Sequence, residues 1–197
     1  MNNNVNYLNG LIKNQGLKTV MRATPLEVGL RQFCQYIKQN VGPIKNLVEI
    51  GSYMGESAAI FAEEFPNTNI ICVDPWLGNF DDTDFCSSDN FTEVEKQFDL
   101  RAVRYPNITK FKGFSTDVEI ECDVVYIDGC HKYECVKEDI LHWAPLAKKV
   151  ISGHDYYLDD NFLKMNPHVA GVKKAVDELL GKPNQLFNDG SWIIIKK

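Results

Sequence analysis

The sequence predicts an α/β domain built on an open, mostly parallel sheet with helices on both faces. Apolar runs and amphipathic helical segments alternate along the 197 residues, which is the order typical of repeated β-α-β units. The predicted strands are continuous apolar runs rather than alternating ones, as expected for strands buried on both faces. The length suits one domain with a sizeable core.

The first predicted helix spans residues 24–41. Thr24 suits the N-cap position, and Pro25 suits the first position of the helix. Glu27, three residues after Thr24, can complete a capping box. Apolar residues then recur at helical spacing: Leu26, Leu30, Phe33, Ile37 and Val41. We therefore expect the domain proper to cover residues 24–197 and to follow an N-terminal arm at 1–23.

The following elements alternate at short intervals. We expect strands at 47–50, 70–73, 108–112, 124–127 and 150–151, with helices at 56–65, at 90 to about 105 and at about 132–143. The end of the chain differs, because a helix at 172–180 precedes two strands. Asn188-Asp189-Gly190 lies between these strands, and Asp-Gly between apolar runs predicts a hairpin. The parallel sheet is thus expected to finish with an antiparallel pair.

Composition excludes several classes of protein. A net charge of -6, from 21 Lys+Arg and 27 Asp+Glu, argues against a nucleic-acid partner, because such affinity depends on clustered cations. No apolar run reaches the roughly 20 residues that span a bilayer. The N-terminus lacks the order of a signal peptide, so we expect a cytoplasmic protein. The six cysteines form no C-x-x-C pair, which favours reduced structural thiols over zinc.

The turn after the first strand, at 48–57, is the most informative segment. It joins a buried strand to a helix, where open α/β sheets bind ligands. Gly51 permits the turn and Gly55 relieves crowding between helix and strand. Asp74, which ends the next strand, can accept both hydroxyl hydrogens of a ribose. Tyr53 stands where a dinucleotide site would have its second glycine, and Glu49 suits a cationic ligand better than a phosphate.

The segments E-I-G-S-Y-M-G-E-S and V-D-P-W resemble motifs I and II of the class I S-adenosylmethionine (SAM)-dependent methyltransferases. The tyrosine in the turn is similar to that of the catechol and macrocin O-methyltransferase branch. The resemblance covers about residues 25–197 and implies a Rossmann-like, seven-stranded sheet of order 3-2-1-4-5-7-6 with strand 7 antiparallel. It also implies the residues that contact SAM: Glu49, Gly51, Ser52, Tyr53, Gly55, Ser57, Asp74, Trp76, Phe114, Ser115 and Asp128. Among these, Trp76 and the 113–115 segment would flank the adenine.

Four polar residues follow the fourth and fifth strands. Asp128 and His131 come after one strand, and His154 and Asp155 after the next. Because carboxyl ends of adjacent parallel strands share one edge, we expect them beside the glycine turn as the catalytic group. A histidine can take the proton of a hydroxyl acceptor, or a divalent cation can lower the pKa of that hydroxyl.

The resemblance implies that Asp128, His154 and Asp155 hold a metal, magnesium in the catechol branch, and that His131 takes the position of the base. Histidine favours softer metals than magnesium, and a metal-free site with His131 or His154 as base stays open. Other interpretations also stay open, since Asp128 can cap the next helix. We expect Asp139 in a solvated helix position, and His142 and His168 on the surface.

Two further segments predict how an acceptor is enclosed. The acidic and aromatic stretch at 77–86 predicts a lid, with Phe80 and Phe85 excluding water, and Tyr156, Tyr157 and the 158–168 loop predict the opposite wall. Such walls suit a small hydroxylated acceptor, for example a sugar. Apolar residues Leu8, Leu11 and Ile12 could serve a homodimer.

Three functions compete at this point. The first is a SAM-dependent O-methyltransferase acting on a small molecule. The second is a non-catalytic SAM- or nucleoside-binding module, in which Glu49 and Asp74 matter while Asp128 and His131 do not. The third is a nicotinamide oxidoreductase, which the missing dinucleotide glycine disfavours.

Overall fold

The computed structural model describes residues 17–196 except 20, 23 and 80–84. The expected dimer arm around residues 8–12 and the Phe80 part of the expected lid lie outside the described residues, and so does the side chain of Phe85.

The sheet has seven strands in the order β3-β2-β1-β4-β5-β7-β6, which confirms the predicted topology. The first five strands pair in parallel, and β7 pairs antiparallel with both β5 and β6. Their bounds are β1 (Asn46–Ile50), β2 (Asn69–Asp74), β3 (Ile108–Lys112), β4 (Cys122–Ile127), β5 (Ala147–Gly153), β6 (Gln185–Leu186) and β7 (Trp192–Ile195). The predicted hairpin is the β6–β7 pair.

The helices alternate with the strands as predicted, with one addition. The five predicted helices are α2 (Pro25–Asn40), α3 (Glu56–Glu64), α4 (Phe91–Ala102), α5 (Tyr133–Leu146) and α7 (Ala170–Leu179). The added helix is α6 (Asp160–Met165), and 3-10 turns η1 (Phe85–Ser88), η2 (Ser115–Asp117) and η3 (Pro167–Val169) fill loops. These elements are too short to show an apolar period, so the sequence pattern did not predict them.

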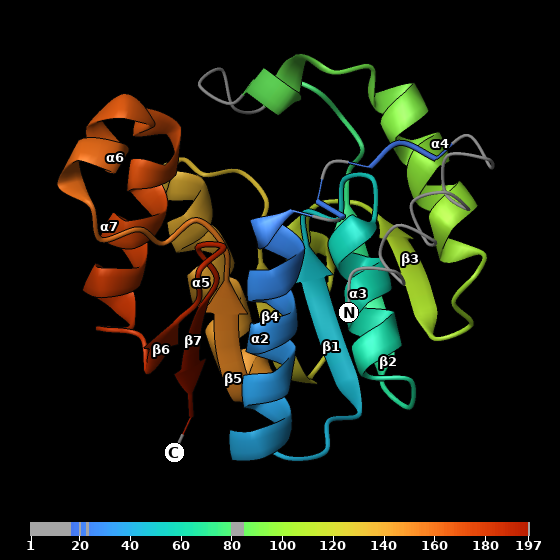
Figure 1. Ribbon diagram of the computed structural model, residues 1–197, viewed down its shortest axis with the longest axis horizontal. Helices are drawn as coiled ribbons and strands as arrows, with labels where there is room; N and C mark the ends of the chain where they lie inside the picture. Colours follow the sequence, from blue (N-terminus) through green and yellow to red (C-terminus); the bar gives the residue numbers. More distant parts are fainter. Residues whose placement is uncertain (1–16, 20, 23, 80–84, 197) are drawn as a thin grey trace.

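Each face of the sheet supports its own core. Strand residues Leu47, Cys72 and Tyr126 contribute to a cluster with apolar residues of α2, α3 and α4. Their chain neighbours Val48 and Val125 face the other way, into a cluster with α5 and α7. This alternation follows from the two-residue period of a strand. The helices therefore cover both faces of the sheet, with α2 and α3 in front of it in Figure 1. The carboxyl ends of the strands lie outside these two covered faces.

Two predicted helix starts have the expected caps. The Thr24 hydroxyl accepts a hydrogen bond from Leu26 N at 3.2 Å, and the Asn90 side chain accepts one from Thr92 N at 3.2 Å. Each cap satisfies a backbone N–H that has no partner within its helix.

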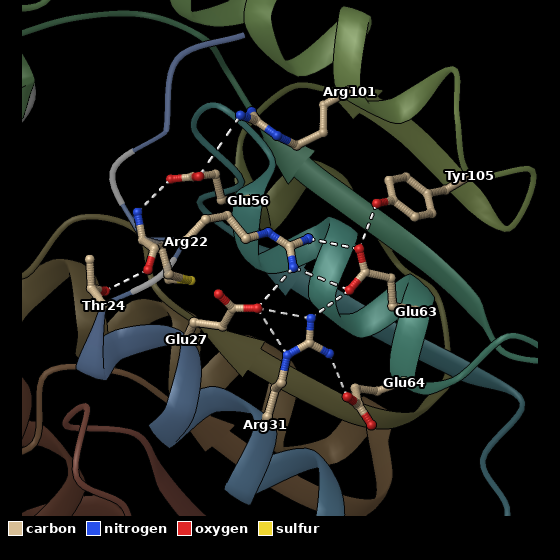
Figure 2. Close-up of polar contacts among 10 residues, drawn as sticks. Arg22, Thr24, Glu27, Arg31, Glu56, Glu63, Glu64, Arg101 and Tyr105 are labelled. Carbon is tan, nitrogen blue, oxygen red and sulfur yellow. Dashed lines mark hydrogen bonds and ion pairs between the residues drawn. The ribbon is translucent and has the colours of Figure 1, made fainter. Parts of the chain in front are cut away.

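An ion-pair network joins the N-terminal segment to α2 and α3, as Figure 2 shows. Arg22 contacts Glu63 at 2.9 Å and Glu27 at 3.2 Å. Arg31 contacts Glu27 at 3.0 Å, Glu63 at 2.6 Å and Glu64 at 2.5 Å. The Arg22 side chain is only 6% exposed, so its charge depends on these carboxylates for compensation.

Glu63 is the central acceptor of this network. It also accepts a hydrogen bond from the Tyr105 hydroxyl at 2.7 Å. Burial alone would raise the pKa of Glu63, but hydrogen bonding and charge from Arg22 outweigh it and lower the pKa. A carboxyl group with a lowered pKa in the folded state stabilises the fold above its unfolded pKa. That contribution is lost as pH falls through the folded pKa.

We expect Glu63→Gln to lower the free energy of unfolding at about pH 7 by about 1–3 kcal/mol, because it leaves the buried Arg22 short of a charged acceptor. The difference from wild type should shrink toward about pH 3, because the wild-type carboxylate loses its charge as pH falls through its lowered pKa. Urea unfolding at both pH values measures this. Glu121→Gln serves as a control, since Glu121 pairs with Lys148 on an exposed surface and such pairs contribute little. A constant difference at both pH values would contradict the prediction.

Candidate active site

The ends of β1, β2 and β4 meet at Gly51. The Gly51 N–H donates to Val73 O at 2.9 Å, and Asp128 N donates to Ile50 O at 2.8 Å. A Cβ on Gly51 would lie 2.1 Å from the Asp128 carbonyl oxygen, and its φ is +83°. Glycine is therefore required here for the turn and for the close approach of the β4 end. The sequence predicted the turn, and the approach to β4 is visible only in the structure.

The rest of the turn is held by the segment that leads from β2 into α4. Gly55, with φ +77°, has no room for a Cβ, which would lie 2.8 Å from the Phe98 ring. The Tyr53 hydroxyl donates to Asp89, and its ring packs edge-to-face on Phe91 with centroids 6.2 Å apart. The crowding that Gly55 relieves thus comes from α4. In Figure 1 the 3-10 turn η1 and the start of α4 lie above the carboxyl edge of the sheet.

Glu49 offers an unused acceptor beneath this turn. The residue is fully buried, and its Oε2 accepts a hydrogen bond from Ser52 Oγ at 2.6 Å. Its Oε1 is buried without a hydrogen-bond partner among the residues that the structure describes. Burial raises the pKa of Glu49. A buried carboxylate oxygen without a donor is costly, which fits a site completed by a donor or cation of a ligand.

Asp74 lies across the turn from Glu49. Its Oδ2 accepts from Tyr53 N at 2.9 Å and its Oδ1 from Trp76 N at 2.6 Å. Burial raises its pKa, although the backbone donors oppose this. Asp74 is thus placed as predicted at the end of β2, and it also fixes the conformation of the turn.

The Trp76 side chain does not lie where the resemblance implies. It is 3% exposed, packs on the Phe98 ring with centroids 4.8 Å apart, and donates from Nε1 to Tyr53 O at 2.9 Å. Lys110 Nζ lies 4.6 Å from its ring centre. The indole therefore belongs to the core under the turn, and this burial argues against the expected contact between its ring and an adenine.

The loop after β3 contains the other expected adenine residues. Phe114 is 47% exposed, so its ring is accessible. The Ser115 hydroxyl accepts from Trp143 Nε1 at 2.8 Å. Asp139, expected in a solvated position, is only 8% exposed. Burial raises its pKa to about 6, opposed by a hydrogen bond with Ser115. The expectation for Asp139 was wrong because the loop after β3 folds over α5, which helical periodicity does not reveal.

Arg101 links the glycine turn to the N-terminal segment, a role that no local sequence pattern indicates. It is 4% exposed and donates to Met54 O in the turn and to Lys18 O at 2.5 Å. It also lies 3.9 Å from Glu56, whose Oε2 accepts from Met21 N at 2.7 Å. Figure 2 shows the contact between Arg101 and Glu56 beside the Arg22 network. Part of the expected N-terminal arm is thus packed against the turn.

The structure brings together all four residues expected to be catalytic. His131 Nε2 lies 3.0 Å from Asp155 Oδ2 and 4.0 Å from Asp128 Oδ1. His154 Nδ1 lies 3.3 Å and 3.7 Å from the same two oxygens. Asp128, His131 and Asp155 each offer a ligand atom within 4.8 Å of the others. The group can therefore bind a cation or move a proton.

Crowded charges shift the pKa values in this cluster in opposite directions. Burial, with charge from Asp155, raises the pKa of Asp128 to about 7, although the histidines oppose it. Burial would lower the pKa of His154, but charge from Asp128 and Asp155 raises it to about 10. Burial also disfavours ionised Asp155, yet charge from His154 lowers its pKa. Opposed shifts of this kind are typical of functional sites.

Residues of η3 and α7 pack against His131 and restrict its position. Its ring packs against His168 with centroids 6.1 Å apart. A Cβ on Gly171 would lie 2.4 Å from His131 O, so the start of α7 packs directly on this loop. His168, expected on the surface, is half-buried in this contact.

A family model described as a methyltransferase domain matches residues 48–156, more than half of the chain. The chain belongs to this methyltransferase family. The matched region contains the glycine turn, Asp74 and the four clustered residues, so the family assignment and the site geometry concern the same part of the molecule.

Solved structures similar to this methyltransferase share its fold. A Staphylococcus aureus protein proposed to be a caffeoyl-CoA O-methyltransferase is 19% identical, with all of this chain and 93% of that chain covered and a TM-score of 0.62. The O-methyltransferase TomG from Streptomyces achromogenes, solved with SAM, is 12% identical over all of this chain and 91% of its own, with a TM-score of 0.60. The N-methyltransferase NodS from Bradyrhizobium japonicum is 12% identical over 88% and 96%, with a TM-score of 0.57.

Two further findings concern this methyltransferase. No curated protein matches it in sequence. Within the described part of the chain, no helix has the length and apolar character to cross a membrane.

We expect Gly51→Ala to destabilise the methyltransferase more than Gly42→Ala. Both glycines have φ near +80°, so both substitutions carry a similar backbone strain of about 1–2 kcal/mol. Only Gly51 also meets the Asp128 carbonyl, whereas nothing lies within 4 Å of a Cβ at Gly42. Urea unfolding of the two variants separates strain from close approach. Equal destabilisation would show that the contact between the turn and β4 is easily relieved.

Proposed function

We propose that this methyltransferase uses SAM to methylate a hydroxyl of a small molecule, in the manner of the catechol and macrocin O-methyltransferase branch, with help from a divalent cation. The observation that carries this proposal is the convergence of Asp128, His131, His154 and Asp155 beside the glycine turn. Two histidines that lie among ionisable carboxyl groups indicate proton transfer or cation binding rather than the binding of SAM alone.

The residues around the turn suit SAM. SAM supplies an electrophilic methyl group on a sulfonium centre. The unpaired Oε1 of Glu49 offers an acceptor for the cationic part of the ligand, and Asp74 ends β2 where a ribose is bound in this fold. Phe114 offers an exposed ring for the adenine. The SAM-bound TomG structure, which has the same fold, supports this choice of cofactor.

The Asp128, His131 and Asp155 group fits a divalent cation. Two carboxylates within 4.8 Å of one another and of a histidine nitrogen repel one another, and a cation relieves that repulsion. His154 Nδ1 faces the same two carboxylates and would supply a second imidazole donor, as the resemblance implies. A bound cation would lower the pKa of an acceptor hydroxyl. Mixed oxygen and imidazole donors favour Mn²⁺ or Zn²⁺ over Mg²⁺.

The chain's own residues can orient the acceptor and take up its proton. His131 is held by Asp155 and by the packing of His168, so its ring is fixed beside the site. Fixed orientation of this kind contributes much of the rate in a transfer reaction. If no cation binds, His131 is the base that the geometry favours.

The acceptor side combines aromatic and polar groups. Tyr157 packs on Phe162 with ring centroids 4.4 Å apart and donates to Asp189 O at 3.1 Å. Leu158 and Met165 are exposed nearby on the segment that contains α6. Aromatic, apolar and polar groups on this segment suit a small acceptor that carries both a ring and hydroxyl groups. The fold alone does not determine the methylated atom, since NodS is an N-methyltransferase.

We expect Glu49→Gln and Asp74→Asn each to weaken SAM binding about 10- to 100-fold, because each removes a charged acceptor worth about 1.5–3 kcal/mol. Titration calorimetry with SAM and S-adenosylhomocysteine measures this. Asp99→Asn is the control, since Asp99 pairs with Lys110 at the surface. Absence of SAM binding to wild type would contradict the proposed cofactor.

We expect wild type to bind Mn²⁺ more tightly than Mg²⁺, and Asp155→Asn to lose most of that affinity, because one of the clustered carboxylates is then neutral. Calorimetry with each metal alone tests this, with Asp99→Asn again as the control, since Asp99 pairs with Lys110 at the surface. Release of S-adenosylhomocysteine with a panel of catechols and sugars, with and without EDTA, tests turnover. SAM binding without turnover on any acceptor would favour a non-catalytic SAM-binding module.

A further inference from the structure

Asp189 is buried although it lies in a tight hairpin. The residue is between β6 and β7 and is 2% exposed. Helix α2 packs over it so closely that a Cβ on Gly29 would lie 2.6 Å from the Asp189 side chain. An aspartate in a two-strand turn is ordinarily solvated, and burying its charge is costly unless it is paired. The burial of Asp189 therefore needs a reason beyond turn formation.

Neutral groups satisfy part of the hydrogen-bonding capacity of the Asp189 carboxylate. Ser191 N donates to Oδ1 at 3.1 Å, and Ser191 Oγ donates to Oδ2 at 2.7 Å. The Ser191 hydroxyl is also 2.8 Å from the Tyr126 hydroxyl. These bonds fix the orientation of the carboxylate but supply no charge.

The basic side chain that faces the Asp189 carboxylate is His154. Asp189 Oδ2 lies 3.9 Å from His154 Nε2, and that nitrogen is buried with no hydrogen bond to any described residue. The opposite nitrogen, Nδ1, lies 3.3 Å from Asp155 and 3.7 Å from Asp128. The imidazole ring is thus placed between the hairpin carboxylate and the two carboxylates of the reaction site.

The hairpin also holds the backbone on either side of this histidine. Trp192 Nε1 donates to His154 O at 3.2 Å, and Tyr156 N donates to Gly190 O at 3.0 Å. The distance between Asp189 and His154 is therefore set by backbone and core contacts rather than by flexible side chains.

We infer that Asp189 is a positioning residue that holds His154 with its Nε2–H toward the hairpin and its Nδ1 toward Asp128 and Asp155. A carboxylate behind a histidine fixes the ring orientation and decides which nitrogen carries the proton. A bound cation would displace the Nδ1 proton, and the Nδ1 lone pair would then point to that cation. This inference rests on the proposed function for the use of Nδ1, but the orientation of the ring can be measured independently.

The first test detects the Nε2–H of His154 by NMR of protein labelled with ¹⁵N-histidine, the signal being assigned by its loss in His154→Gln. We expect wild type to show an Nε2–H signal that exchanges slowly with solvent. Asp189→Asn, which keeps the shape, should shift this signal and speed its exchange. Ser191→Ala, which keeps the charge, should change it much less. A wild-type Nε2 that is unprotonated or exchanges freely would overturn the inference even if the variant fails to fold.

The second test is titration of Mn²⁺ and, separately, of SAM into wild type and Asp189→Asn. We expect Mn²⁺ affinity to fall about 10- to 100-fold, as for other outer partners of metal-binding histidines, with SAM affinity unchanged. Loss of both affinities, or of neither, would overturn the positioning role. If wild type binds no Mn²⁺, the proposed cation site fails, and the Nε2–H signal alone then decides the role of Asp189.

Discussion

The close approach of β1 and β4 at Gly51 is the constraint on which the rest of the site depends. A Cβ at this position would lie 2.1 Å from the Asp128 carbonyl oxygen, so the glycine turn and the end of β4 are in direct backbone contact. The parallel pairing of β1 with β2 and β4 brings Glu49, Asp74 and Asp128 to one edge. The proposed contacts of Glu49 and Asp74 with SAM, and of Asp128 with a cation, follow from this arrangement of three strand ends.

Charge is distributed unevenly around that edge. On the side of α3 and α4, buried arginines stabilise the scaffold, since Arg101 links the turn to the N-terminal segment and Arg22 links that segment to α3. On the side of β5 and β7, the partly buried Asp128 and Asp155 and the buried Asp189 surround two histidines. The first arrangement pairs each arginine with carboxylates or backbone carbonyls and suits a structural role. The second leaves carboxylates crowded together, which suits a cation or a transferable proton.

The candidate site was predicted well where it depends on chain order and less well where it depends on packing. Asp128, His131, His154 and Asp155 follow adjacent strands, so parallel topology was enough to bring them together. The solvated position expected for Asp139 was wrong, and the burial of Trp76 was not predicted, because neighbouring loops and helices cover both residues and apolar periodicity does not reveal such contacts. Arg101 and Asp189 were missed as site residues because their partners lie far away in the chain.

The sequence by itself determined the strand and helix order, the sharp turn at Gly51 and the acid at the end of β2. These features depend on local apolar periodicity and on the few residues that such turns accept. Only the tertiary structure decided which side chains are buried, which carboxylates share a histidine and how the hairpin reaches the site. Those properties arise from contacts between residues distant in sequence, such as Gly29 with Asp189. Such contacts cannot be predicted from local sequence patterns.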